Sequence, residues 1–136
     1  LLARDGVPQT KDSAYYREWY ARTKAKMLAA ADRVRLCDYE RHPSSRTLVV
    51  AYGITHRVVR PLREDYSLFK PVRMFPLLED ELRAAAADHD RVVVVEMNDG
   101  QYRGEVRKAL GREVLGIGLL GGTISLKEIR ERLREL

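Results

Sequence analysis

The stretch Val92-Val93-Val94-Val95-Glu96-Met97-Asn98-Asp99-Gly100-Gln101-Tyr102 decides the fold. Four consecutive valines are typical of a strand that is buried on both faces, as in a parallel sheet. The polar residues that follow include an asparagine suited to cap a helix and a glycine suited to a tight turn. The stretch therefore predicts a strand that ends in a helix, a junction where ligands and partner domains gather in open α/β sheets.

Predicted strands and predicted helices alternate over most of the chain. Apolar runs predict strands, and segments with helical spacing or capping signals predict the helices between them. The predicted fold class is α/β: a three-layer sandwich with a mainly parallel sheet of four to five strands and right-handed crossovers. Strands are expected at residues 47–53, 68–74, 91–97 and 113–118, and helices at residues 54–65, 77–88, 100–110 and 126–136.

The N-terminal part has a different character. Asp12 or Ser13 is suited to cap a helix that reaches about Val34, with Tyr16, Tyr20 and Met27 along one seam. Its aromatic side chains could pack on the domain's own sheet or on a neighbouring domain, since aromatic residues dominate both cores and interfaces. We therefore divide the chain into a linker with an N-terminal helix, residues 1–41, and an α/β domain, residues 42–136.

Composition narrows the classes of function. The formal net charge is +5 over 136 residues, but the basic residues form no cluster, which argues against nucleic-acid binding. The absence of an apolar run of roughly 18 residues argues against a membrane span. A single cysteine, Cys37, agrees with the reducing cytoplasm. Because the first residue is Leu1 rather than Met and no signal peptide is evident, we expect a cytoplasmic piece of a longer polypeptide.

Two patterns suggest chemistry that their context does not support. Residues 116–121 match the dinucleotide motif G-x-G-x-x-G, but no further strand with an acidic residue follows. Tight packing is the favoured interpretation, and Gly121, Gly122 and Thr123 are kept as a weak phosphate-binding candidate. His42, His56 and His89 lack the spacing of metal ligands, so we expect no metal site.

The stronger candidates are Glu96, Asn98, Gly100 and Gln101. Asn98 could simply cap the helix that begins near Gly100. Glu96 is harder to explain, because a carboxylate in an apolar strand needs a partner. Arg73, Arg103, a capping amide or a group on another subunit could each serve.

These motifs together resemble the C-terminal domain of the alpha subunit of 2-oxoacid:ferredoxin oxidoreductases, of the 2-oxoglutarate type. The central element is the Glu-Met-Asn-x-Gly-Gln run of residues 96–101. Supporting elements are residues 50–53, residues 70–76, the Gly121-Gly122 turn followed by residues 125–128, and the Asp5-Gly6 linker.

The resemblance implies a transketolase C-terminal-like fold downstream of a pyrimidine-binding domain. It also implies an enzyme that oxidatively decarboxylates a 2-oxoacid such as 2-oxoglutarate to the acyl-CoA and reduces ferredoxin. Thiamine diphosphate, Mg²⁺ and an iron-sulfur cluster are expected in the full complex with the beta subunit, and none of them on this chain. Glu96, Asn98, Gly100 and Gln101 would then lie at a subunit contact, and the isolated fragment would be inactive. The alternative is a standalone regulatory or nucleotide-binding module that uses the glycine-rich turn.

Overall fold

The computed structural model describes residues 11–34 and 36–136, and the chain divides into two compact units, residues 1–35 and 36–136. The first unit contains helix α1 (Ser13–Ala31) and one turn of 3₁₀ helix, η1 (Asp32–Val34). The predicted cap is confirmed, because Asp12 Oδ1 accepts hydrogen bonds from the amides of Ala14 and Tyr15 at 2.9 and 3.0 Å. No residue of α1 is buried within the structure. The Asp5-Gly6 linker lies outside the described residues.

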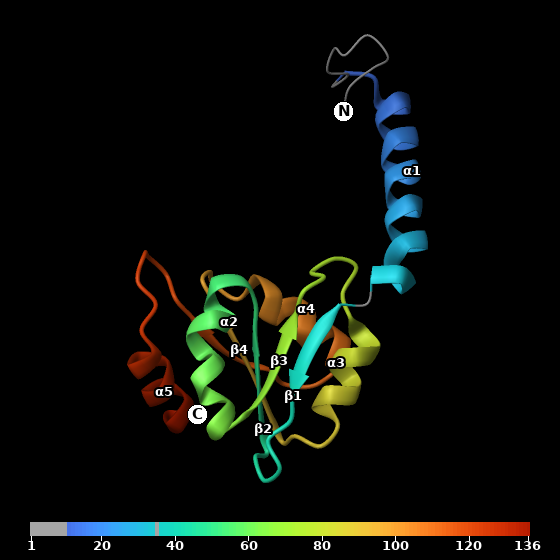
Figure 1. Ribbon diagram of the computed structural model, residues 1–136. Helices are drawn as coiled ribbons and strands as arrows, with labels where there is room; N and C mark the ends of the chain where they lie inside the picture. The colour runs from blue at the N-terminus through green and yellow to red at the C-terminus, as the bar shows by residue number, and fades with distance from the viewer. Residues whose placement is uncertain (1–10, 35) are drawn as a thin grey trace. The chain divides into compact units, whose positions relative to one another are not determined.

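The second unit is built on one five-stranded sheet (Figure 1). The strand order is β1-β3-β2-β4-β5, with every pair parallel except β1 and β3. The predicted α/β class is therefore confirmed. The strands are β1 (Cys37–Glu40), β2 (Thr47–Ala51), β3 (Ser67–Pro71), β4 (Arg91–Glu96) and β5 (Leu115–Gly118).

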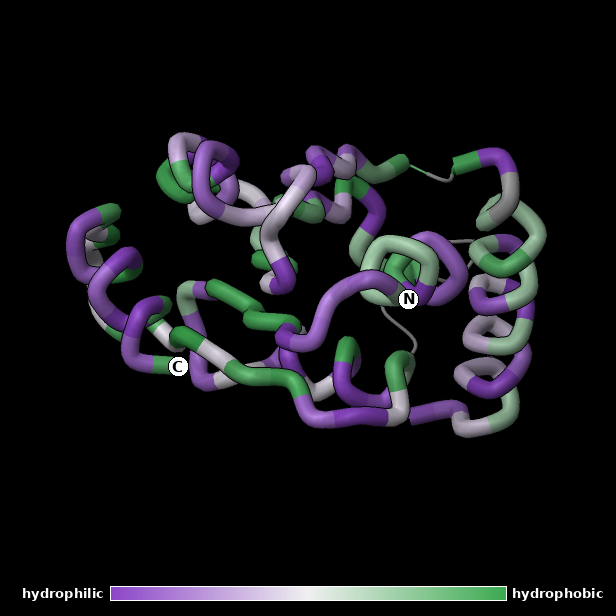
Figure 2. Tube along the Cα trace, turned by 90° about the horizontal axis from the view of Figure 1, so that it is seen from below, coloured by the Kyte–Doolittle hydropathy of each residue, from purple (hydrophilic) through white to green (hydrophobic). Residues whose placement is uncertain are grey.

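Helices cover both faces of the sheet and complete three layers (Figure 1). On one face, α3 (Glu79–Ala86) and α4 (Gln101–Leu110) enclose a core that includes Leu82 and Val106. On the other face, α2 (Gly53–Val59), η2 (Arg60–Glu64) and α5 (Leu126–Glu135) enclose a second core. Colouring by hydropathy shows hydrophobic and hydrophilic segments alternating along the trace (Figure 2).

The central strands explain why the sheet forms here. All five residues of β2 are buried, and it pairs with β4 from Thr47 opposite Arg91 to Ala51 opposite Val95. Strands buried on both faces need continuous apolar sequence, which is what the runs in β2 and β4 supply. Their carboxyl ends therefore lie at the same edge of the sheet, and the candidate residues after β4 lie at that edge too.

Strand β1 was missing from the sequence prediction, which placed the start of the α/β domain at residue 42. The structure places Cys37–Glu40 in the sheet, antiparallel to β3, and the compact unit begins at Leu36. The strand is short and half polar, because as an edge strand it leaves Asp38 and Glu40 outside both apolar cores.

Two prolines shape the ends of their elements. At Pro71 the strand β3 pairs with Cys37 of β1 but not with β2, since its pairing with β2 ends at Phe69, which suits a residue that has no amide hydrogen to donate. The helix predicted over residues 54–65 is not continuous. It changes from α2 to the 3₁₀ helix η2, in whose first turn Pro61 lies, because proline cannot donate the hydrogen bond of a helix interior.

Candidate functional site at the carboxyl end of strand β4

Glu96 is the last residue of β4 and is 1% exposed. Its Oε2 accepts a hydrogen bond from the amide of Tyr102 at 2.9 Å, and its Oε1 accepts one from the amide of Arg103 at 3.0 Å. These amides belong to the first turn of α4, where backbone donors have no partner within the helix. Of the partners considered from the sequence, the capping amides are therefore the ones that Glu96 contacts, and a negative group there also matches the helix dipole.

Asn98 makes a second cap on the same helix. Its Oδ1 accepts hydrogen bonds from the amides of Gly100 at 3.0 Å and Gln101 at 2.9 Å, as its cap preference predicted. Gly100 has a φ of 91°, a left-handed conformation that favours glycine. The two side chains together satisfy four consecutive amides, so the turn is fixed from both sides.

Tyr52 joins the two caps. Its hydroxyl donates to Glu96 Oε2 at 3.2 Å and accepts from Asn98 Nδ2 at 3.0 Å. Its ring meets that of Tyr102 edge-on, with the centroids 5.2 Å apart. The sequence analysis used Tyr52 only as part of a motif and missed this role, although a tyrosine at the end of an apolar strand is a detectable signal.

The titration of these phenols follows from their burial. Burial raises the pKa of Tyr102 well above its usual range, and burial followed by the charge of Glu96 raises the pKa of Tyr52. Both rings therefore keep their protons near neutral pH. Of the motif, only Met97, Asp99 and Gln101 present exposed side chains, so these are the groups that another molecule could reach.

In the glycine-rich turn, one of the three candidate amides, that of Thr123, is already bonded within the fold. Gly121 and Gly122 have φ values of 85° and 48°, and the amide of Thr123 already donates to the carbonyl oxygen of Gly121 at 2.7 Å. Helix α5 begins later, at Leu126, and is capped by Ser125, whose Oγ accepts from the amide of Glu128 at 3.3 Å. The turn is thus separated from the helix end that would attract an anion.

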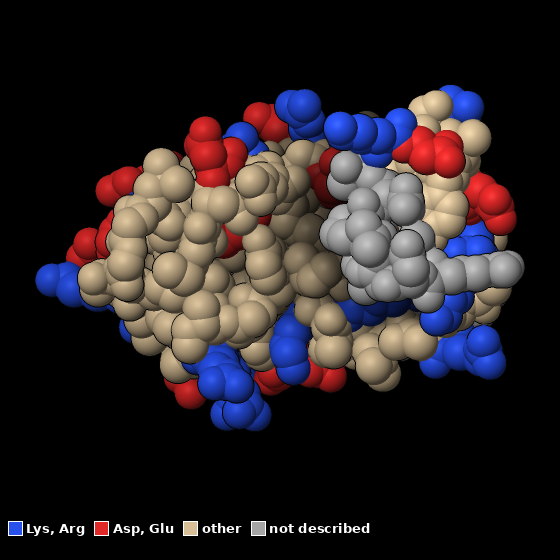
Figure 3. Space-filling view, turned by 90° about the horizontal axis from the view of Figure 1, so that it is seen from above, with Lys and Arg blue, Asp and Glu red and all other residues tan. Residues whose placement is uncertain are grey.

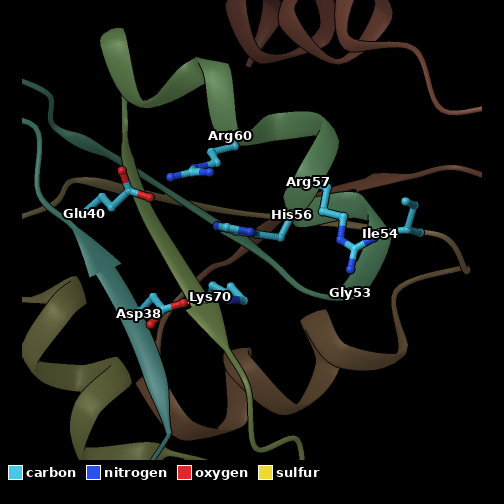
Figure 4. Close-up of a pocket in the computed structure, with 8 residues that line it drawn as sticks. All are labelled: Asp38, Glu40, Gly53, Ile54, His56, Arg57, Arg60 and Lys70. Atoms are coloured by element: carbon cyan, nitrogen blue, oxygen red, sulfur yellow. Dashed lines mark hydrogen bonds and ion pairs between the residues drawn. The ribbon is translucent and has the colours of Figure 1, made fainter.

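A polar cleft that the sequence analysis did not predict lies beside α2 (Figure 4). It has a volume of about 910 Å³. Lys70 Nζ pairs with Asp38 at 2.6 Å, which lowers the pKa of that carboxyl group, and burial lowers the pKa of His56. Its two acidic side chains come from β1 and its basic ones from α2, η2 and β3, so the walls carry both charges. The lining residues are Asp38, Glu40, Gly53, Ile54, His56, Arg57, Arg60 and Lys70.

Over residues 11–34 and 36–136, no three His, Cys, Asp or Glu side chains are grouped so that they could hold a metal ion. Within the same residues, no helix has the length and apolarity to span a bilayer. His42 Nδ1 accepts from the amides of Ser44 and Ser45, and His89 Nδ1 lies 2.9 Å from the carbonyl oxygen of Ala85.

The fold and the site define a class: an α/β domain whose most conspicuous polar network holds a strand-to-helix junction together. Comparison with known proteins shows which proteins this chain resembles. The chain is 36% identical over 98 residues to the ketoisovalerate oxidoreductase subunit VorB of Methanothermobacter thermautotrophicus, and 33% identical over 98 residues to that of Methanothermobacter marburgensis. Each match covers 65% of this chain and 28% of the relative.

A solved structure agrees in fold. The 2-oxoglutarate:ferredoxin oxidoreductase from Magnetococcus marinus superposes with a TM-score of 0.75 at 19% identity, over 98% of this chain and 25% of that chain. No family model matches the chain. The predicted resemblance is confirmed as a similarity: the chain is similar in sequence to ketoisovalerate oxidoreductase subunits and in fold to a 2-oxoglutarate:ferredoxin oxidoreductase, and it spans about a quarter of the length of each.

Proposed function

We propose that this chain is the non-catalytic C-terminal domain of the alpha subunit of a thiamine-dependent 2-oxoacid:ferredoxin oxidoreductase. The enzyme would oxidatively decarboxylate a 2-oxoacid to the acyl-CoA and reduce ferredoxin. The domain would support assembly with the preceding pyrimidine-binding domain and the beta subunit, and shape the approach to the active site. The observation that carries the proposal is the identity of 36% and 33% to two oxidoreductase subunits.

The geometry around Glu96 supports a non-catalytic role. A carboxylate that serves a cofactor needs an oxygen facing it, but both oxygens of Glu96 are occupied by Tyr52, Tyr102 and Arg103. The side chain is also 1% exposed. These residues do not fit a thiamine diphosphate site, so we expect thiamine diphosphate, Mg²⁺ and the iron-sulfur cluster to be held by other parts of the complex.

The exposed part of the motif supports a contact. Asn98 and Gly100 fix the turn, and the rigid turn presents the exposed Gln101 at the carboxyl edge of the sheet. A side chain held on a rigid backbone loses little entropy when it binds, which suits a position at a subunit contact.

Co-purification tests the proposal. The complete alpha subunit that carries this domain is expressed with its beta partner, as the native sequence and as Gln101→Ala, Asn98→Ala and Glu105→Gln. We expect 2-oxoacid- and CoA-dependent ferredoxin reduction by the native complex, and weaker recovery of the beta subunit with the first two variants. Glu105→Gln is the control, since Glu105 is exposed on the same helix and pairs with Lys108 at the surface. A complete complex without such ferredoxin reduction would show that the proposed function is wrong.

A further inference from the structure

The large exposed apolar side chains of the α/β unit are concentrated at one edge. Nine are exposed among the described residues 36–136, and seven of these lie at the carboxyl ends of the parallel strands. Leu36 lies there too, because β1 runs antiparallel and the Leu36 carbonyl accepts from the amide of Val72 at 3.0 Å. We call this set the apolar edge: Leu36, Ile54, Val72, Met74, Phe75, Met97 and Leu120.

The opposite edge of the same sheet is polar and paired. Arg41 contacts Asp88 at 2.8 Å, and Arg46 contacts Asp90 at 2.6 Å. Arg112 donates to the carbonyl oxygens of His89 and Ala86 at 2.8 and 2.9 Å. Charged loops of this kind are typical of an edge that faces water, so the two ends of the sheet have different surroundings in the working protein.

Two side chains of the apolar edge are exposed over most of their surface. Leu120 is 73% exposed and Phe75 is 63% exposed. Figure 3 views this side of the molecule: over the α/β unit, uncharged residues occupy most of the middle, and Lys, Arg, Asp and Glu lie mainly at the periphery. Exposed apolar side chains gathered at one edge, with charged groups around them, are typical of a protein interface.

The size of the apolar edge fits a domain contact. It has members beside all five strands, and at about 4.8 Å between neighbouring strands it is roughly 20 Å wide. That breadth suits a standard interface of about 800 Å² per partner. The absence of a dominant charge favours an apolar protein surface over a phosphate-bearing ligand such as a nucleic acid.

We propose that the apolar edge is covered by the apolar surface of another domain of the same oxidoreductase subunit. The occupant is inferred from length, because this chain spans 28% of its relatives and 25% of the solved chain, so most of each of those polypeptides lies outside the matched part. The inference rests on the proposed function and adds to it the surface that makes the contact.

Methionine oxidation tests the inference in the complete complex and in the 136-residue chain alone. Met74, Met97 and Met27 are 37%, 40% and 39% exposed, so an unselective oxidant should attack them at similar rates in the free chain. In the complete alpha subunit, with or without its beta partner, we expect the rates at Met74 and Met97 to fall about tenfold or more, relative to an added free-methionine standard, because the proposed occupant belongs to the same subunit. Unchanged rates in a complex that assembles and turns over would overturn the inference and leave the proposed function standing.

Substitutions give an independent measurement. Phe75→Lys and Leu120→Lys should each weaken recovery of the assembled complex about tenfold, as expected for apolar anchors. Leu136→Lys is the matched control, since Leu136 is 41% exposed and lies away from the apolar edge. Equal recovery of all three variants would contradict the inference. So would protection of Met74 and Met97 that rises with the concentration of the chain alone, because the occupant would then be a second copy.

Discussion

A side-chain carbon placed at Gly118 would lie 2.8 Å from the carbonyl oxygen of Asn98. The last residue of β5 therefore passes against the backbone that follows β4, and only a residue without a side chain fits there. This contact explains the second glycine of the G-x-G-x-x-G pattern by close packing. The pattern that resembles a dinucleotide motif thus serves the same strand-to-helix junction that Glu96 and Asn98 cap.

Gly118→Ala should destabilise the fold by about 2 kcal/mol, because the added methyl group meets backbone atoms that cannot rotate away. Gly104→Ala is the matched control. Gly104 lies within α4 with nothing within 4 Å of the added carbon, so alanine should stabilise the helix by roughly 0.5 to 1 kcal/mol. Urea unfolding of both variants checks the prediction. Two variants of equal stability would show that the close approach at Gly118 has no energetic consequence.

The first glycine of the pattern has a different neighbour. A carbon at Gly116 would lie 2.6 Å from Cδ of Arg103, which is a side chain and can move. We therefore expect Gly116→Ala to cost about 1 kcal/mol alone and much less when combined with Arg103→Ala. A double-mutant cycle by urea unfolding measures this coupling. Additive effects of Gly116→Ala and Arg103→Ala on the free energy of unfolding would contradict this coupling. Arg103→Ala should not reduce the destabilisation caused by Gly118→Ala.

Glu96→Gln should destabilise the domain by about 2 kcal/mol, because one of the two amides now bonded to the carboxylate would face the NH₂ group of the new side chain. Glu105→Gln on the same helix should change stability by less than about 0.5 kcal/mol, since its pair with Lys108 is exposed. Chemical denaturation with both variants at pH 7 makes the comparison. If Glu96→Gln were as stable as the native chain, the helix-capping role would be wrong.

The sequence predicted the parts of the fold that depend on burial. The apolar runs of β2 and β4 favour strands of a covered parallel sheet, and both strands lie buried at its centre. Strand β1 was missed because its residues are half polar. Its signal was the alternation of Cys37 and Tyr39 with Asp38 and Glu40, which is only four residues long.

The sequence located the candidate site, but it did not predict which groups bond to Glu96. Glu96 stood out because a buried carboxylate needs partners, and this reasoning holds. Its partners are the amides of Tyr102 and Arg103, six and seven residues away, and the hydroxyl of Tyr52, just beyond the end of β2. No sequence pattern specifies a cap at that distance, because it depends on how far the strand and the helix turn back on each other.

Stability should fall when the pH drops below about 6.5, the ordinary pKa of histidine. Burial lowers the pKa of His89, and its Nδ1 donates to the carbonyl oxygen of Ala85. Because the folded pKa lies below the unfolded one, the unfolded chain binds more protons between the two values. The stability is therefore complete above pH 6.5 and is lost as the pH falls through the folded pKa. The slope should stay below about 1.4 kcal/mol per pH unit for each histidine.

Urea unfolding between pH 7.5 and 5 measures this dependence, and His89→Gln should flatten it. His56 is also buried with a lowered pKa, so part of the slope should remain until both histidines are replaced. This pH range lies above the acidic range in which Asp38 would contribute to the slope, because Lys70 lowers the pKa of Asp38. A slope that is unchanged in the double variant would assign the pH dependence to other groups.

The isolated 136-residue chain should neither bind thiamine diphosphate nor convert a 2-oxoacid. The physical reason is that Glu96, the buried carboxylate of its motif, has both oxygens occupied within the fold and is 1% exposed. Isothermal titration calorimetry with thiamine diphosphate and Mg²⁺, and 2-oxoacid-dependent reduction of ferredoxin or a viologen dye, check the two parts. The complete complex serves as the positive control. A saturable heat of binding to the chain alone would show that the domain assignment is wrong, since the cofactor would then have a site that the Glu96 network does not provide.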